Sequence, residues 1–72
     1  MDEMRERDRK KYESIPIDVW RVGITTHELK QFWWTSAREV QRLVNVFVKH
    51  GKVRQIGTYV ISVNHAGKAV IR

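Results

Sequence analysis

The sequence predicts a small α+β domain, in which three helices precede a C-terminal β-hairpin. Two observations predict the main helices: the stretches 26–33 and 36–50 are amphipathic, and a hydroxyl residue with Glu three positions later opens each of them. A third observation predicts the hairpin. After Gly51 the helical period gives way to two β-favouring runs around Gly57-Thr58. The chain has 72 residues, which is enough for one small domain.

The stretch from Ser36 to His50 is the most strongly patterned part of the chain. Ser36 and Glu39 form a capping-box pattern, in which the hydroxyl accepts from the Glu39 N–H and the carboxylate reaches back to Ser36. A basic last turn and Gly51 are typical of a helix end. At about 100° per residue, one face of this helix is apolar and the opposite face is polar. The apolar face holds Val40, Leu43, Val44 and Phe47, and the polar face holds Arg38, Arg42, Asn45 and Lys49.

The excess positive charge lies in the part of the chain that is expected to fold. Residues 1–14 contain five acids and five bases, so this segment is neutral, and we expect it as a solvated short helix or as disordered chain. Residues 15–72 contain nine bases and three acids, which accounts for the net charge of +6. We therefore divide the chain into a charged N-terminal segment, 1–14, and a folded domain, 15–72. A basic surface favours a polyanionic partner, most often nucleic acid.

The segment between these two parts predicts a further short helix. Pro16 interrupts any helix that continues from the N-terminus but suits the first turn of a new one. We expect that helix from about Ile17 to Val22, ended by Gly23, with Trp20 in the core. Ile24 then begins a brief extended link.

The helix over 26–33 begins with a second capping box, formed by Thr25 and Glu28. Its spacing places Leu29, Phe32 and Trp33 towards the core. The capping signal at Ser36 follows so closely that only a tight turn fits between the two helices, which predicts a helix-turn-helix unit.

The C-terminal part predicts strands. The runs 52–56 and 59–63 are expected to pair across the two-residue turn Gly57-Thr58. A second turn signal at 64–67 is followed by a third β-favouring run, 68–72.

Several classes of function are not expected. The chain has no cysteine and no apolar run long enough for a membrane span or a signal peptide, so we expect a cytoplasmic protein, or a nucleoid-associated or phage-encoded one in its host. The histidines His27, His50 and His65 share no helical spacing with carboxylates, so we expect no metal site. No catalytic constellation is present, so neither an enzyme nor a cofactor is expected.

The order of these elements resembles a winged helix-turn-helix DNA-binding domain. The resemblance covers about Ile24 to Val63 and is carried by three stretches, namely Ile24-Thr25-Thr26-His27-Glu28-Leu29, Ser36 with Val40-Gln41-Arg42-Leu43, and Phe47-Val48-Lys49-His50-Gly51-Lys52-Val53. Small phage and bacterial regulators are the most similar subgroup. The turn departs from the family pattern, because Trp34 stands where a glycine is common and Thr35 where a small apolar residue is common. A positive φ at Trp34 would strain the backbone.

The resemblance implies that the helix over 36–50 lies in the major groove of double-stranded DNA and that the hairpin is a wing on the backbone or minor groove. Arg pairs with guanine, and Gln or Asn with adenine, whereas hydroxyls, Lys and helix N-termini bind phosphates. The DNA-binding residues that it implies are Thr25, Thr26, Lys30, Ser36, Ala37, Arg38, Gln41, Arg42, Asn45, Lys49, Lys52, Arg54 and Thr58.

Alternatives remain open for several residues. Arg38 and Arg42 could instead pair with Glu39 or Glu28 on a solvated helix face. Trp33 is expected in the core, whereas Trp34 is expected either in the core or exposed. An exposed Trp34, together with Val46, would suit a homodimer or another protein partner, which makes the domain an adapter. A third reading is stacking of Trp33 and Trp34 on the unpaired bases of single-stranded DNA or RNA.

Overall fold

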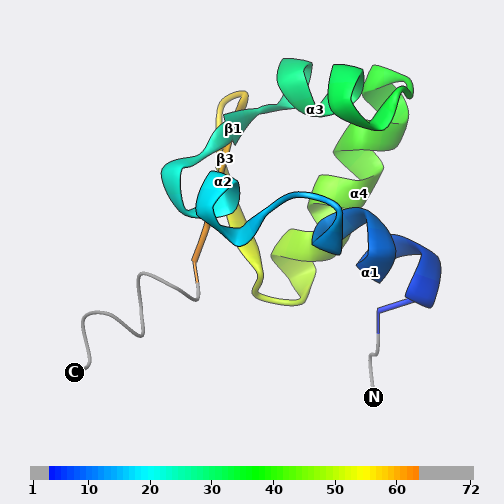
Figure 1. The fold of residues 1–72 in the computed structure, drawn as a ribbon, viewed down its shortest axis with the longest axis horizontal. Helices are drawn as coiled ribbons and strands as arrows, with labels where there is room; N and C mark the ends of the chain where they lie inside the picture. Colours follow the sequence, from blue (N-terminus) through cyan, green and yellow to red (C-terminus); the bar gives the residue numbers. More distant parts are fainter. Residues whose placement is uncertain (1–3, 64–72) are drawn as a thin grey trace.

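The computed structural model describes residues 4–63, which form an α+β fold of four helices and one three-stranded antiparallel sheet. The helices are α1 (Glu6–Glu13), α2 (Ile17–Val22), α3 (Thr26–Trp33) and α4 (Ala37–Lys49), and the strands are β1 (Ile24–Thr25), β2 (Val53–Ile56) and β3 (Tyr59–Ser62). In Figure 1, α4 crosses the molecule with α1 on one side and the sheet on the other, and it contacts both α1 and β2. The predicted helices over 17–22, 26–33 and 36–50 are therefore confirmed, as is the hairpin.

The sheet has the strand order β1-β3-β2. Ile56 pairs with Tyr59 across the turn at Gly57, whose φ of 63° is the positive value that a two-residue hairpin turn needs. The sequence prediction missed β1, because Ile24 and Thr25 were read as a plain extended link. Ile24 pairs with Val60 and Thr25 with Tyr59. This link is therefore strand β1, which lies next to β3 in the sheet. The predicted turn at 64–67 and strand at 68–72 lie outside the described residues.

Four aromatic side chains form the centre of the core. Tyr12 stacks on Trp20 with ring centroids 5.2 Å apart, and Phe47 meets Tyr12, Trp20 and Trp33 edge-on at 5.3–6.2 Å. Offset and edge-on contacts of this kind are the favourable geometries for aromatic pairs. The indole N–H groups are also satisfied, because Trp20 donates to the Tyr12 carbonyl and Trp33 to the Ser14 hydroxyl. The core positions predicted for Trp20 and Trp33 are confirmed.

One residue of α3 that was predicted in the core is exposed. Phe32 was expected in the core but is 56% exposed, whereas Leu29 and Trp33 are buried. Leu29 and Trp33 are four positions apart and so share one face, and Phe32 lies about 100° away from Trp33. The short helix buries one narrow stripe, and the larger Trp33 takes the place next to α4.

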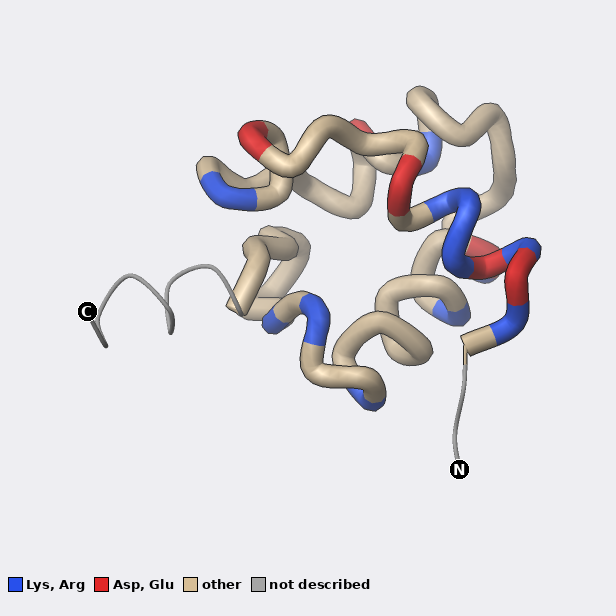
Figure 2. Tube along the Cα trace, turned by 60° about the horizontal axis from the view of Figure 1, so that its bottom comes forward, with Lys and Arg blue, Asp and Glu red and all other residues tan. Residues whose placement is uncertain are grey.

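Residues 6–13 form an ordered part of this fold. Tyr12 belongs to the aromatic cluster, and Asp8 is only 3% exposed because it faces Arg42 on α4. Residues 6–13 therefore pack against the same core as the helices that follow. Figure 2 shows the two signs of charge alternating along this helix.

The turn between α3 and α4 has left-handed backbone at Trp34, with φ 58° and ψ 51°. Trp34 is the non-glycine residue with positive φ in the described chain, and its side chain is 92% exposed. Left-handed backbone at a residue with a Cβ costs about 1 kcal/mol or more. The turn thus keeps the tight geometry for which a glycine is usual, although the residue is a tryptophan.

Candidate nucleic-acid interface

A hollow on the surface brings together three segments that are distant in the sequence. It lies between the first half of α3, the first half of α4 and the tip of the hairpin, and its lining residues are Thr26, His27, Lys30, Ala37, Val40, Gln41 and Thr58. The hairpin tip is fixed to α3, because the Thr26 N–H donates to the Thr58 carbonyl at 2.7 Å. Five of the residues that the resemblance nominates are thus neighbours, namely Thr26, Lys30, Ala37, Gln41 and Thr58.

An amide network connects α4 with the hairpin. Nε2 of Gln41 donates to Oε1 of Gln55 on β2 at 2.8 Å and to Oδ1 of Asn45 at 3.0 Å. The Gln55 amide donates back to Gln41 and also to the Gly57 carbonyl at the hairpin tip. These contacts link Gln41 and Asn45, two exposed amides whose donors and acceptors are the groups needed to read base edges.

The centre of the exposed face of α4 carries two cations. Arg38, Asn45 and Lys49 are separated by seven and four positions, which places them on one stripe of the helix, and all three are exposed. Among the described residues, neither Arg38 nor Lys49 forms an ion pair. This stripe is the part of the predicted face that is free to meet an anion.

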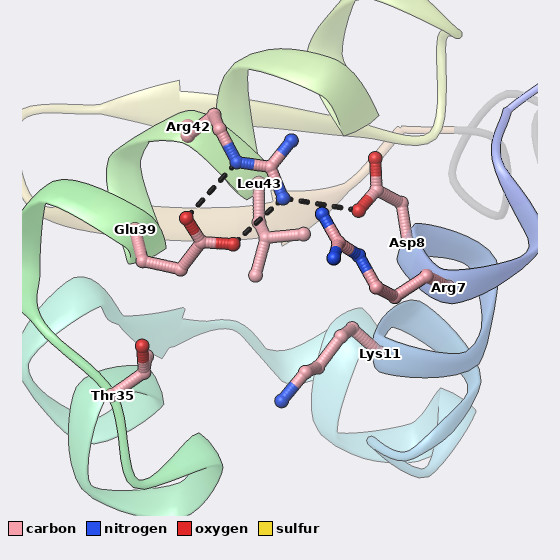
Figure 3. A pocket seen from close by; sticks show the side chains of 7 residues that line it. All are labelled: Arg7, Asp8, Lys11, Thr35, Glu39, Arg42 and Leu43. Atoms are coloured by element: carbon pink, nitrogen blue, oxygen red, sulfur yellow. Dashed lines mark hydrogen bonds and ion pairs between the residues drawn. The ribbon is translucent and has the colours of Figure 1, made fainter.

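Arg42 lies differently from the prediction. It donates to Glu39 from Nε at 3.0 Å and from Nη2 at 2.6 Å, and Nη2 also reaches Asp8 at 3.1 Å. Figure 3 shows the guanidinium between the two carboxylates, with Arg7 beside it. The alternative that Arg42 pairs with Glu39 is therefore confirmed, and α1 adds Asp8 as a second carboxylate, which no local pattern in the sequence indicated.

These contacts change the acid–base properties of the pair. The hydrogen bond from Arg42 lowers the pKa of Glu39, and the charges of Arg42, Arg7 and Lys11 add to that effect. Conversely, the hydrogen bonds to Glu39 and Asp8 raise the pKa of Arg42. At neutral pH the cluster holds Arg42 in place as a structural cation.

The two cations of the hairpin do not join the α4 face. Lys52 is half-buried at the base of the hairpin, with Nζ 5.7 Å from the centroid of the Tyr12 ring. Arg54 is exposed, but it precedes Gln55, whose side chain contacts α4. Because neighbouring residues of a strand point to opposite faces, Arg54 points away from α4.

Two of the four nominated hydroxyl residues, Thr25 and Ser36, cap helices. Thr25 and Glu28 form a complete capping box at the start of α3. At α4, Ser36 accepts from the Glu39 N–H at 3.2 Å, but the second half of the predicted box is missing, because the Glu39 carboxylate binds Arg42. Thr25 and Ser36 therefore fix the two helix starts, and their side chains have intramolecular partners.

The apolar residues considered for a protein contact do not lie together. Trp34 lines a hollow with Lys30, Gln31 and Thr35 at the α3–α4 turn. Val46 is half-buried against the core and lines another hollow, next to Met4 and α1. Phe32, which was predicted to be inside, is the second large apolar side chain exposed near Trp34 in the sequence.

Two residues of the candidate site were missed. His27 lines the hollow between α3, α4 and the hairpin, and Gln55 orients Gln41. His27 follows the nominated Thr25-Thr26 directly, which was a usable signal. Gln55 had none, since only the register of β2 and the packing of β2 on α4 bring it to Gln41.

No family model, curated protein or solved structure matches this chain. The proposed function therefore rests on the geometry of the site. Within residues 4–63, no cluster of three or more His, Cys, Asp or Glu side chains could hold a metal ion. Of the helices in that range, none is long and apolar enough to cross a membrane.

Proposed function

We propose that the chain is a winged helix-turn-helix domain that binds double-stranded DNA, in the manner of a small transcriptional regulator or a phage-type accessory factor. The strand order β1-β3-β2 and the succession of α3, a tight turn, α4 and a hairpin support this assignment. In it, α4 enters the major groove and the tip of the hairpin lies on the backbone beside it.

The single observation that carries the proposal is the hollow shared by α3, α4 and the hairpin tip. Residues that were nominated separately from three parts of the sequence meet there, as a common ligand would require. Lys30 and the start of α3 would bind phosphates, Gln41 and Asn45 would contact base edges, and Arg38 would reach a guanine or a phosphate.

The structure changes which substitutions test this proposal. Arg42 is a poor choice, because its removal would leave Asp8 buried without a partner. Arg38→Glu with Lys49→Glu reverses two exposed charges that have no described ion pair. Arg21→Glu with Lys10→Glu is the matched control, since it reverses the same charge at positions paired with Asp18 and Glu6, away from α4.

The experiment is fluorescence anisotropy against duplex DNA, single-stranded DNA and RNA at about 50 and about 200 mM salt. We expect the duplex to bind best, and log affinity to fall with log salt at a slope of about −3 to −5, from roughly three to five phosphate contacts. The pair on α4 should lose most of this affinity, and the control should not. A flat salt response, or equal loss in both variants, would contradict the proposal.

A second candidate function is supported by one observation. Trp34 is 92% exposed on a strained turn, which favours a contact with a partner protein or an unpaired base. In the same titrations, stacking on a base would quench tryptophan fluorescence with the single strand more than with the duplex. An adapter would bind none of the three oligomers and would be indifferent to the charge reversal on α4.

A further inference from the structure

The described acids of the N-terminal segment all have partners, whereas two of its arginines have none among the described carboxylates. Glu6 pairs with Lys10 at 3.8 Å and Glu13 with Arg9 at 3.9 Å, both within the helix. Asp8 is buried against Arg42. The three described acids of this segment are thereby used, whereas Arg5 and Arg7 are exposed and form no ion pair with any described carboxylate.

These two arginines lie beside the end of α4. A hollow between the helices is lined by Met4, Arg5, Arg7, Asp8, Arg42, Val46, Lys49 and His50. Four of its residues are cations, and its one carboxylate is the buried Asp8. Arg7 also lowers the pKa of Glu39 through its charge, which places it on the side of α1 that faces α4. The surface of this hollow is thus strongly positive.

The hollow is on the opposite flank of α4 from the hairpin. Gln41 contacts Gln55 on β2, and its neighbour Arg42 contacts Asp8 on α1, although the two residues are only about 100° apart on the helix. The exposed stripe with Arg38, Asn45 and Lys49 lies between these two directions. The stripe therefore has the hairpin on one side and α1 on the other, and Lys49 belongs to both the stripe and the α1 hollow.

We propose that Arg5 and Arg7, together with Lys49, bind the phosphate backbone on the side of the major groove opposite the hairpin. This inference rests on the proposed function, and it adds a second set of phosphate contacts to the DNA. A helix in the major groove has one phosphate strand on each side, so a protein with cations on only one flank leaves the other strand without contacts. The contacts would add affinity for any sequence and would carry no base preference.

The test compares two double variants of the same helix. Arg5→Ala with Arg7→Ala removes the two exposed cations, and Arg9→Ala with Lys10→Ala removes two cations that are paired with Glu13 and Glu6. Both variants change the net charge equally. We expect the first to weaken duplex binding about tenfold or more at about 100 mM salt and to make the salt slope shallower by about 1.8, since each phosphate contact contributes about 0.9. The second should change affinity less than about threefold.

Further variants and readouts make the outcome decisive. The loss of affinity should be the same for duplexes of different base sequence. Arg5→Lys with Arg7→Lys should restore the salt slope, because it keeps both charges. Circular dichroism checks that α1 persists, and Arg5→Gln with Arg7→Gln repeats the test if alanine alters the fold. An unchanged slope, or equal losses in the two pairs, would overturn the inference.

The failure of this inference can be told from the failure of the proposed function. Suppose that the wild-type chain binds the duplex, that reversing the charges of Arg38 and Lys49 abolishes binding, and that the Arg5 and Arg7 variant binds like wild type. Only the proposed phosphate contacts of α1 are then wrong. If the wild-type chain does not bind the duplex, both proposals are wrong.

Discussion

Nη2 of Arg42 donates to Oδ1 of Asp8 at 3.1 Å and so joins α4 to α1 across 34 positions of sequence. The Asp8 side chain is 4% exposed and that of Arg42 is 39% exposed, so the carboxylate depends on this contact much more than the guanidinium does. This difference predicts that substituting Arg42 destabilises the fold more than substituting Asp8.

Arg42→Ala should destabilise the fold by about 1–3 kcal/mol, because it leaves a buried carboxylate without its partner. Asp8→Asn keeps the shape and leaves Arg42 bound to Glu39, so it should cost less. Arg9→Ala, at an exposed pair within α1, is the control and should change stability by less than about 0.5 kcal/mol. Urea unfolding measures all three, and an equal cost for Arg42→Ala and Arg9→Ala would contradict the assignment.

The lowered pKa of Glu39 predicts a dependence of stability on pH. A carboxyl group whose pKa is lower in the folded than in the unfolded state stabilises the fold above its ordinary pKa of 4.5, and this contribution is lost as pH falls through the folded value. Glu39→Gln should therefore be less stable than wild type at about pH 6, and the difference should shrink towards about pH 2.

Thermal unfolding of wild type and Glu39→Gln at about pH 6 and about pH 2 measures the difference in their stability. Glu13→Gln is the comparison, because Glu13 lies in an exposed pair with Arg9 at 3.9 Å. A difference between wild type and Glu39→Gln that stays constant with pH would show that Glu39 does not titrate against Arg42.

Two glycines with positive φ predict different costs for the same substitution. At Gly23, with φ 106°, a Cβ would overlap the Tyr59 hydroxyl, which donates to the Val22 carbonyl. At Gly51, with φ 73°, a Cβ would meet open space. Gly51→Ala should cost about 1 kcal/mol from backbone strain alone, and Gly23→Ala should cost at least about 1 kcal/mol more, because Tyr59 must move as well. Chemical denaturation compares the two, and equal costs would mean that Tyr59 yields freely.

The left-handed backbone at Trp34 predicts that glycine is the better residue for stability. Trp34→Gly should be more stable than Trp34→Ala by about 1 kcal/mol, since both remove the exposed indole and only glycine relieves the strain. The midpoints of urea unfolding measure the difference. If the two variants are equally stable, the turn does not hold this residue at positive φ in solution.

The amide network predicts an effect on sequence preference, if α4 reads bases as proposed. Gln41→Ala should reduce discrimination at one base pair by about 1–3 kcal/mol. Gln55→Ala should produce a smaller loss at the same base pair, because Gln55 orients Gln41 without replacing it. Binding to a duplex set with single substitutions measures both. Gln31→Ala, beside Trp34 in another hollow, is the control and should leave the preference unchanged.

Periodicity and caps alone located most elements of this fold. The apolar stripe of α4, the capping residues Thr25 and Ser36 and the turn at Gly57 are local signals, which depend on residues within one or two helical turns or one hairpin. The sequence marked Trp34 as a residue that a positive φ would strain, but only the structure shows that its φ is positive, at 58°. The buried face of α3 depends on tertiary contact, since α3 has three large apolar residues and packing on α4 selects Leu29 and Trp33.

What the sequence by itself determined was therefore the small α+β fold class and the helix that presents the polar stripe. The tertiary structure alone decided which charges on that stripe are free. Asp8, Gln55 and Tyr12 become the partners of Arg42, Gln41 and Lys52 through packing across 34, 14 and 40 positions, and no local pattern records contacts of that range. For the same reason the local pattern of α1 did not show that Asp8 is buried against α4, or that Arg5 and Arg7 are left without an ion pair to the described carboxylates.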